Sequence, residues 1–115
     1  MNELIPLKIE LKKQSGLLLL QYPHDETYEL GFEFLRVHSP SAEVRGHGKP
    51  VLQSGKKSVR LIGIEPAGNY AVKLSFDDGH DSGLYSWSYL RDLCKNQETL
   101  WKAYLKQLEE VGAAR

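Results

Sequence analysis

The sequence has little of several features that would assign it to a class of protein directly. It contains one cysteine, Cys94, which excludes an intramolecular disulfide framework and suits a reducing cytoplasm. Its 15 Lys and Arg residues balance 15 Asp and Glu residues, so nothing indicates general attraction to nucleic acid or to anionic membranes. The longest apolar run, Leu17 to Leu20, is too short to cross a bilayer. These absences favour one soluble, cytoplasmic domain over residues 1–115.

The residues that usually carry catalysis or bind metals lack the required spacing. No two of the four histidines are three or four residues apart: His24, His38, His47 and His80. A single cysteine cannot form a cysteine-rich zinc or iron–sulfur site within one chain. There is no G-x-S-x-G nucleophile elbow, and Gly79 explains Asp77 and Asp78 as turn residues. The sequence therefore predicts no catalytic set, no cofactor and no metal, and it favours a protein that is not an enzyme.

The clearest structural pattern lies in residues 69–94. Tyr70, Val72, Leu74 and Phe76 alternate with smaller or polar residues, which is the period of a half-buried strand. A turn at 77–80 leads to a second strand through residues 84–85. A short helix should follow at about 88–94, with Ser86 or Ser88 as its N-cap. The unit is strand, tight turn, strand and helix.

The same unit recurs earlier in the chain. Residues 20–36 align with residues 74–91 after one extra residue in the second turn, and apolar positions match apolar positions on both sides of it. Alternating hairpins also resemble each other by chance, so duplication and coincidence both remain open. In either case, two hairpin-helix units should share one core.

The remaining patterns complete an α+β fold with a mostly antiparallel sheet of about six strands. Alternation at residues 7–11 predicts a first strand, the run at 17–20 a central strand apolar on both faces, and residues 27–30 a third strand before a helix at 31–37. Residues 59–64 predict a fourth strand that ends before Pro66. Apolar residues at helical spacing predict a C-terminal amphipathic helix at about 97–111, capped by Asn96 and Gly112 and packed on the sheet.

The long middle segment, residues 38–58, has no clear periodicity and is rich in Gly, Ser and Pro. A connection this long in a small domain is usually functional or disordered. Its four Lys and Arg residues against one Glu give 4 − 1 = +3, so basic character is local. Lys57 stands where a phosphate-binding Walker loop needs Ser or Thr, and the segment has no aromatic residue to stack on a base. Phosphate and nucleic-acid binding are therefore disfavoured.

Three stretches carry a family resemblance: LRVHSPSAEVRGHG, LIGIEPAGNYAVKLSFDDGHDSGLYSW and YLRDLC. They resemble the gamma-butyrobetaine hydroxylase-like N-terminal domain family, small bacterial proteins of unknown function, from about Leu7 to Leu93. The module is also similar to the N-terminal zinc domain of carnitine-pathway hydroxylases and to a domain attached to some P-loop iron–sulfur cluster carriers. The hydroxylases' catalytic iron lies in a separate domain, so oxygenase activity is not implied.

The resemblance also implies where a zinc site would lie. The hydroxylases hold zinc through three cysteines after a Leu-Arg pair and one histidine in a later turn. Here the Leu-Arg pair is Leu35-Arg36, the cysteine positions fall on Ser39, Ser41 and Val44, and the histidine falls on His80. Serine hydroxyls replace thiolates poorly at zinc. We therefore expect His80 to lack a metal and hydrogen bonds around the serines to tether the segment.

These observations favour a non-catalytic module that binds a partner protein through residues 38–58 beside the His80 turn. The candidate binding residues are Arg36, His38, Ser39, Ser41, Glu43, Arg45, His47, Lys49, Lys56 and His80. Two alternatives remain: an accessory role in iron–sulfur cluster assembly or delivery, suggested by the module's fusion partners, and a small-molecule-binding protein or unrecognised enzyme.

Overall fold

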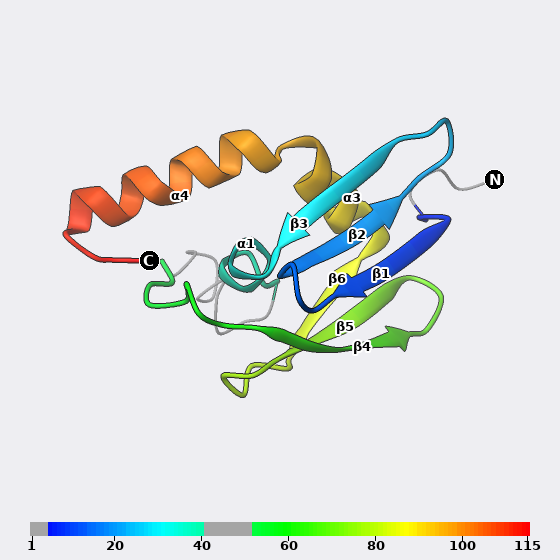
Figure 1. Ribbon diagram of the computed structural model, residues 1–115, viewed down its shortest axis with the longest axis horizontal. Coiled ribbons are helices and arrows are strands. Elements are labelled where there is room, and N and C mark those ends of the chain that lie inside the picture. Colours follow the sequence, from blue (N-terminus) through cyan, green and yellow to red (C-terminus); the bar gives the residue numbers. More distant parts are fainter. Residues whose placement is uncertain (1–4, 41–51) are drawn as a thin grey trace.

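The computed structural model describes residues 5–40 and 52–115. These residues form six antiparallel strands in two three-stranded sheets, together with three helices. The predicted α+β class and the count of six strands are confirmed, and the strands divide into two sheets. Figure 1 shows α4 extending beyond the sheets, which gives an elongated molecule of 44 × 31 × 25 Å. No helix within the described ranges is long and apolar enough to cross a membrane.

The first sheet has the order β1 (Lys8–Lys12), β2 (Leu17–Gln21), β3 (Thr27–Gly31). β2 is the central strand, as the Leu17–Leu20 run predicts, and Leu18 and Leu20 are completely buried. Leu17 and Leu19 on its other face are only half-buried. Both faces of β2 are thus apolar, as predicted, but only the face with Leu18 and Leu20 is fully buried.

The second sheet has the order β4 (Leu61–Ala67), β5 (Ala71–Phe76), β6 (Gly83–Ser86). Val72, Leu74 and Phe76 are buried along β5, as the alternation predicts, whereas Tyr70 precedes the strand and is 60% exposed. β4 begins and ends later than expected, and Pro66 lies within it, opposite Val72. β4 is an edge strand, where the missing proline N–H does not interrupt the ladder.

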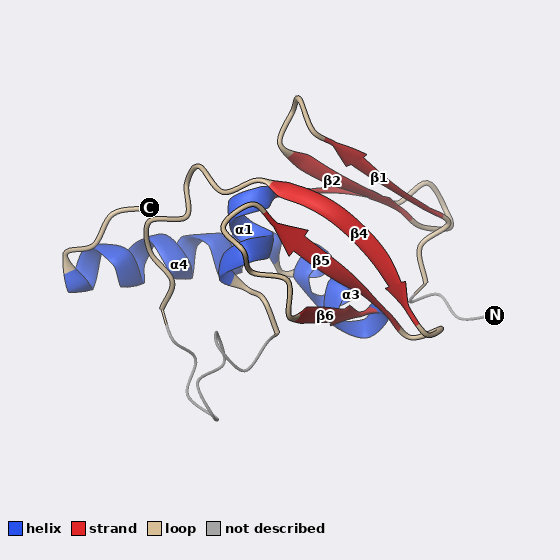
Figure 2. Ribbon diagram, turned by 90° about the horizontal axis from the view of Figure 1, so that it is seen from below, coloured by secondary structure: helices blue, strands red, loops and turns tan. Residues whose placement is uncertain are grey.

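Two short helices follow the sheets, α1 (Phe32–Val37) after β3 and α3 (Trp87–Lys95) after β6. The Ser86 side chain accepts a hydrogen bond from the Tyr89 amide at 3.1 Å, so Ser86 is the N-cap of α3. Both helices lie against the sheets (Figure 2). Their buried residues join those of β2, β3, β5 and β6 in one hydrophobic core.

The C-terminal helix α4 (Gln97–Val111) has the predicted bounds. Gly112 ends it in the left-handed conformation at φ 70°, as expected of a C-cap. Asn96 precedes the helix without a side-chain capping bond, because its amide donates instead to the Asp92 carbonyl at 2.9 Å. Tyr104 and Leu108 are buried against α1, whereas Val111 is 65% exposed. Only part of the apolar stripe is covered.

The two halves share a topology of three strands and one helix, with reciprocal contacts between them. Arg36 of α1 donates from Nε to Asp78 in the β5–β6 turn at 2.9 Å. Arg91 of α3 donates from Nη2 to Glu26 in the β2–β3 turn at 2.7 Å. Residues 36 and 91 are aligned positions of the two units, so each helix is tied to the hairpin turn of the other half. This pattern favours duplication over coincidence.

Candidate functional site

A buried polar cluster lies where the segment after α1 meets the β5–β6 turn. Ser39 Oγ and His80 Nε2 share a hydrogen bond of 2.7 Å, although the residues are 41 positions apart. Ser39 is 2% exposed and His80 is 4% exposed. The pair is therefore closed to solvent and fixes the chain leaving α1 to the second hairpin.

Gly83 makes this close approach possible. A Cβ at Gly83 would stand 2.5 Å from Ser39 Oγ and 3.1 Å from the Tyr85 ring. Tyr85 donates its hydroxyl to the Leu35 carbonyl at 2.5 Å, and burial raises its pKa. With Pro40 also 3.4 Å from that Cβ position, any residue larger than glycine at position 83 would displace the serine.

Asp78 holds the second part of the cluster. Its carboxylate accepts hydrogen bonds from Arg36 Nε at 2.9 Å, Lys56 Nζ at 3.1 Å and the His80 amide at 3.2 Å. Burial raises the pKa of Asp78, but these three donors outweigh burial and hold it below its ordinary value. Because Arg36 precedes and Lys56 follows the stretch 41–51, one carboxylate anchors both sides of the middle segment.

The donor set of this cluster does not fit zinc. His80 Nε2 is occupied by Ser39, and a neutral hydroxyl stands at a position where the related hydroxylases carry a thiolate. Nor does the pair resemble an activated nucleophile, because both side chains are buried. The hydrogen-bonded pair of Ser39 and His80 therefore has a structural role, and we call it the clasp.

The structure brings together four of the ten candidate residues: Arg36, Ser39, Lys56 and His80. His38 points elsewhere and donates from Nδ1 to the Phe34 carbonyl at 2.9 Å, while burial lowers its pKa. Five candidates lie outside the described residues: Ser41, Glu43, Arg45, His47 and Lys49. Sequence reasoning missed the anchoring role of Asp78, because aspartate is common in turns and its presence there did not indicate an ion-pair partner.

A first groove, the α1–α4 groove, runs between the segment ends and the C-terminal helix. It has a volume of about 440 Å³. Val37, His38, Leu52 and Gln53 line one side. Residues of α4 line the other side: Leu100, Ala103, Tyr104, Gln107, Glu110 and Val111. The exposed part of the α4 stripe thus faces a groove at the point where residues 41–51 leave and rejoin the described structure.

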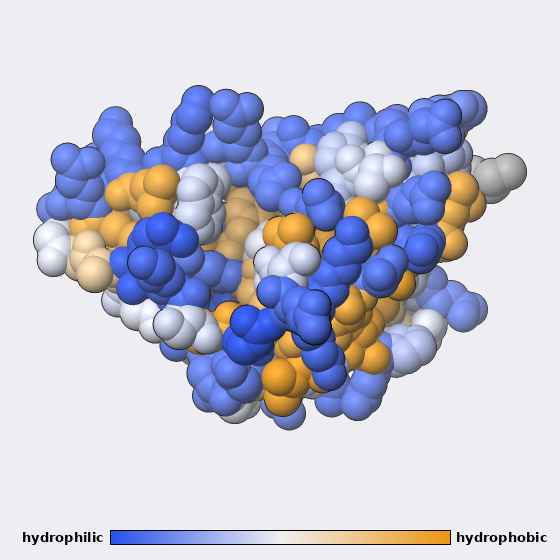
Figure 3. Space-filling view, viewed as in Figure 1, coloured by the Kyte–Doolittle hydropathy of each residue, from blue (hydrophilic) through white to orange (hydrophobic). Residues whose placement is uncertain are grey.

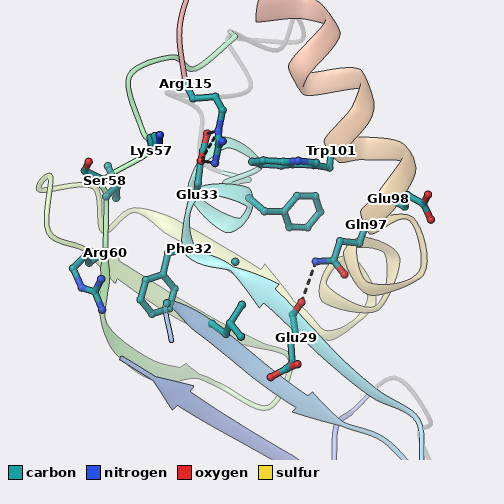
Figure 4. Close-up of a pocket in the computed structure, with 15 residues that line it drawn as sticks. Glu29, Phe32, Glu33, Lys57, Ser58, Arg60, Gln97, Glu98, Trp101 and Arg115 are labelled. Atoms are coloured by element: carbon teal, nitrogen blue, oxygen red, sulfur yellow. Dashed lines mark hydrogen bonds and ion pairs between the residues drawn. The ribbon is translucent and has the colours of Figure 1, made fainter. Parts of the chain in front are cut away.

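A second groove, the Trp101 groove, has a volume of about 570 Å³. Figure 4 shows residues 57–60 along one side, Trp101 and Gln97 of α4 on the other, and Phe32 at the base. In the space-filling view the molecule is hollowed over α1, and apolar surface is visible inside the hollow (Figure 3). Sequence reasoning did not find this groove, because its lining comes from five separate segments whose meeting depends on the tertiary fold.

A buried carboxylate closes one end of the Trp101 groove. Glu33, which is 7% exposed, accepts hydrogen bonds from Arg115 at 2.8 and 3.2 Å and from the Tyr104 hydroxyl at 2.8 Å. The Arg115 guanidinium lies 5.2 Å from the Trp101 ring centroid. Burial is the main cause of a raised pKa for Tyr104, and the neighbouring Glu33 carboxylate raises it further. The hydroxyl therefore remains a donor at neutral pH. The network fixes the position of α4 and the indole.

Cys94 is 4% exposed, and burial raises its pKa to about 11. The thiolate, which is the form that reacts and binds metals, is therefore disfavoured at neutral pH. Within the described residues, no three His, Cys, Asp or Glu side chains are grouped so that they could hold a metal ion.

Comparison with known proteins gives a family and a fold. The model of the family described as gamma-butyrobetaine hydroxylase-like, N-terminal, matches residues 9–91. The chain is similar to two proteins with NMR solution structures. One is 58% identical with a TM-score of 0.87 (96% of this chain, 89% of that chain), and the other is 51% identical with a TM-score of 0.82 (96% and 83%).

A third similar structure is the crystal structure of a protein of unknown function in the DUF971 family from Acidithiobacillus ferrooxidans. It is 35% identical with a TM-score of 0.68, and the match covers 79% of this chain and 93% of that chain. The comparison with curated proteins found no match.

Proposed function

Because this chain belongs to the gamma-butyrobetaine hydroxylase-like N-terminal domain family, we propose that it is a non-catalytic module that binds an acidic, amphipathic segment of a partner protein in the α1–α4 groove. The observation that carries this proposal is the position of the groove. It lies between α4 and the two ends of the basic middle segment, with part of the apolar stripe uncovered.

The shape and lining of the groove support a peptide ligand. Leu100 and Val111 of α4 and Leu52 on the opposite side offer apolar contacts, and Gln107 offers an amide group beside them. A groove of this kind accepts the apolar face of a helical segment, with anchor residues one turn apart. The clasp of Ser39 and His80 holds one wall in place, which lowers the entropy lost on binding.

Charge indicates the polar character of the partner. Residues 38–58 carry a net charge of +3 in a protein whose total is zero. Within that segment, Lys56 is paired with Asp78, and the other basic residues in the sequence are Arg45, Lys49 and Lys57. A basic segment beside an apolar groove favours acidic residues on the solvent side of the bound peptide.

Quantitative affinity capture from an extract of the source organism tests this proposal. We would compare wild type with Ala103→Glu, which adds a negative charge at an exposed groove position, and with Arg45→Ala/Lys49→Ala. Lys102→Ala is the matched control, because Lys102 is on α4 but does not line the groove. We expect one protein to be retained by wild type and the control, and lost from both other variants.

The captured protein would then be mapped by cross-linking. Cross-links should join an acidic amphipathic segment of the partner to α4 near Val111 and to Leu52. The proposal fails if no protein is enriched over blank resin, if both groove variants retain the same protein, or if the cross-links lie outside the groove. The iron–sulfur alternative gains no support from Cys94, whose thiol is buried and protonated.

A further inference from the structure

The Trp101 groove combines aromatic surfaces with fixed positive charge. Phe32 is 4% exposed and forms its base, while the half-buried Trp101 ring stands opposite residues 57–60 (Figure 4). The volume of about 570 Å³ is within the range of small-molecule sites. Phe34 also lines the cavity, 6.4 Å from the Trp101 ring, and three aromatic residues around a cavity of this size suit a flat, apolar ligand body.

The cations of the groove are held on one side. The Arg60 guanidinium lies 5.4 Å from the Phe32 ring centroid and donates to the Lys13 carbonyl, so its position is fixed. Lys57 lines the same wall and makes no ion pair within residues 5–40 and 52–115. Arg60 thus supports the Phe32 ring, and Lys57 is the cation of this wall that can pair with an anionic ligand.

The acidic residues of the groove are directed to other partners. Glu29 pairs with Lys12 at 3.5 Å, Glu98 with Lys102 at 3.1 Å, and Glu33 with Arg115 at 2.8 Å. Figure 4 shows the Glu29 and Glu98 carboxylates turned away from the space between Phe32 and Trp101. Arg115 and Arg60 are also held by other groups, so Lys57 is the charged lining residue with no ion pair in the described part of the chain.

Gly31 leaves the space open. It adopts an ordinary extended conformation at φ −69° and ψ 154°, so its backbone does not require glycine. A Cβ at this position would have no heavy atom within 4 Å. Because Gly31 lines the groove, a larger side chain there would project into the open space of the groove rather than into the core.

We propose that the Trp101 groove binds a small organic anion with a flat aromatic body, which packs between Trp101 and the wall of residues 57–60 and pairs its carboxylate or sulfonate with Lys57. This site is separate from the α1–α4 groove, and its occupancy does not depend on the partner protein proposed above.

Titration with naphthalene-2-carboxylate, followed by NMR of the full chain, tests the proposal. We expect saturable shifts confined to the groove and to the Trp101 indole, with a dissociation constant on the order of 1 mM. The neutral 2-naphthamide should bind about fivefold more weakly, because it cannot pair with Lys57.

Variants locate the binding. Gly31→Leu should weaken the carboxylate about tenfold or more by obstructing the cavity, and Lys57→Gln about fivefold by removing one charge. Lys106→Gln, on the exposed surface of α4, is the matched control and should bind as wild type does. Ser58→Phe provides a second obstruction, on the opposite wall, if Gly31→Leu does not fold.

The proposal is overturned by any of three results: shifts that do not saturate, equal affinity for the amide and the carboxylate, or unchanged affinity when the cavity is obstructed. Loss of carboxylate binding in the obstructed variant, together with unchanged binding in the control, would support it. Partner capture in the α1–α4 groove can fail or succeed independently of this outcome.

Discussion

At the scale of single residues, the stability of the polar cluster depends strongly on the ion pair between Arg36 and Asp78. Arg36 has only 8% of its side chain exposed, so without Asp78 its charge would be buried beside the weak Gln53 contact at 3.5 Å. Leaving one member of a buried ion pair without its partner costs more than the pair itself contributes. Asp78 is therefore the position at which a conservative change should have the largest effect.

We predict that Asp78→Asn lowers the free energy of unfolding by about 2 kcal/mol at neutral pH, because it removes the charge that Arg36 and Lys56 share. The pKa of Asp78 is depressed in the folded state, so this contribution is complete above the ordinary carboxylate pKa and disappears as pH falls through the folded value. Urea unfolding at several pH values measures the difference. Asp81→Asn, at an exposed position of the same turn, should stay within about 0.5 kcal/mol of wild type at every pH.

We predict that Gly83→Ala costs about 1–3 kcal/mol, because the added methyl group overlaps Ser39 Oγ. Ser39→Ala removes that oxygen but leaves His80 Nε2 without this partner. In the double variant the overlap is relieved, so its cost should be smaller than the sum of the two single costs. Thermal unfolding of the four proteins of this cycle gives the coupling. Strict additivity would show that the close contact between these residues has no energetic effect.

At the scale of secondary-structure elements, the sequence was most informative where periodicity and capping residues agreed. The bounds of α4 and the N-cap of α3 follow from local chemistry, and the structure has both. The end of β4 was wrong, because an edge strand accepts a proline that a central strand would not. The clasp between Ser39 and His80 was indicated only through family resemblance, and the two grooves not at all, because their walls meet through long-range packing.

We predict that Glu33→Gln loosens α4 without unfolding the sheets. Glu33 joins α1 to Tyr104 within α4 and to Arg115 beyond it, so the amide loses the ion pair and one acceptor oxygen. The expected cost is about 1–2 kcal/mol, with faster hydrogen exchange in the last turns of α4 and little change in β2 or β5. Glu98→Gln removes an exposed pair on the same helix and should cost only about 0.3 kcal/mol. Uniform acceleration of exchange over the whole chain would contradict this assignment.

At the scale of the whole molecule, both halves contribute to one core. Leu18 and Leu30 of the first sheet and Leu74 and Tyr85 of the second are fully buried in the same cluster. The reciprocal ion pairs of Arg36 and Arg91 connect the halves at two further places. Neither half has a core of its own to keep it folded.

We therefore predict that Leu18→Ala in the first half destabilises the whole domain by about 3 kcal/mol. Both tryptophans, Trp87 and Trp101, belong to the second half. Their fluorescence should nevertheless report the same shift in unfolding midpoint as circular dichroism does. Leu7→Ala, at a position that is 67% exposed, should stay within about 0.5 kcal/mol of wild type. Two separate transitions in Leu18→Ala would mean that the halves fold independently.

The reciprocal contacts of Arg36 and Arg91 affect how the molecule would tolerate a break in its backbone. Each contact joins residues on opposite sides of the stretch 41–51, and the shared core is formed across the same division. Two fragments cut there would each contain the residues of three strands and at least one helix, and each would carry the arginine and the acidic turn that the other requires. Mixed in equal amounts, they should reassemble by fragment complementation, as two subunits of a pseudo-symmetric heterodimer.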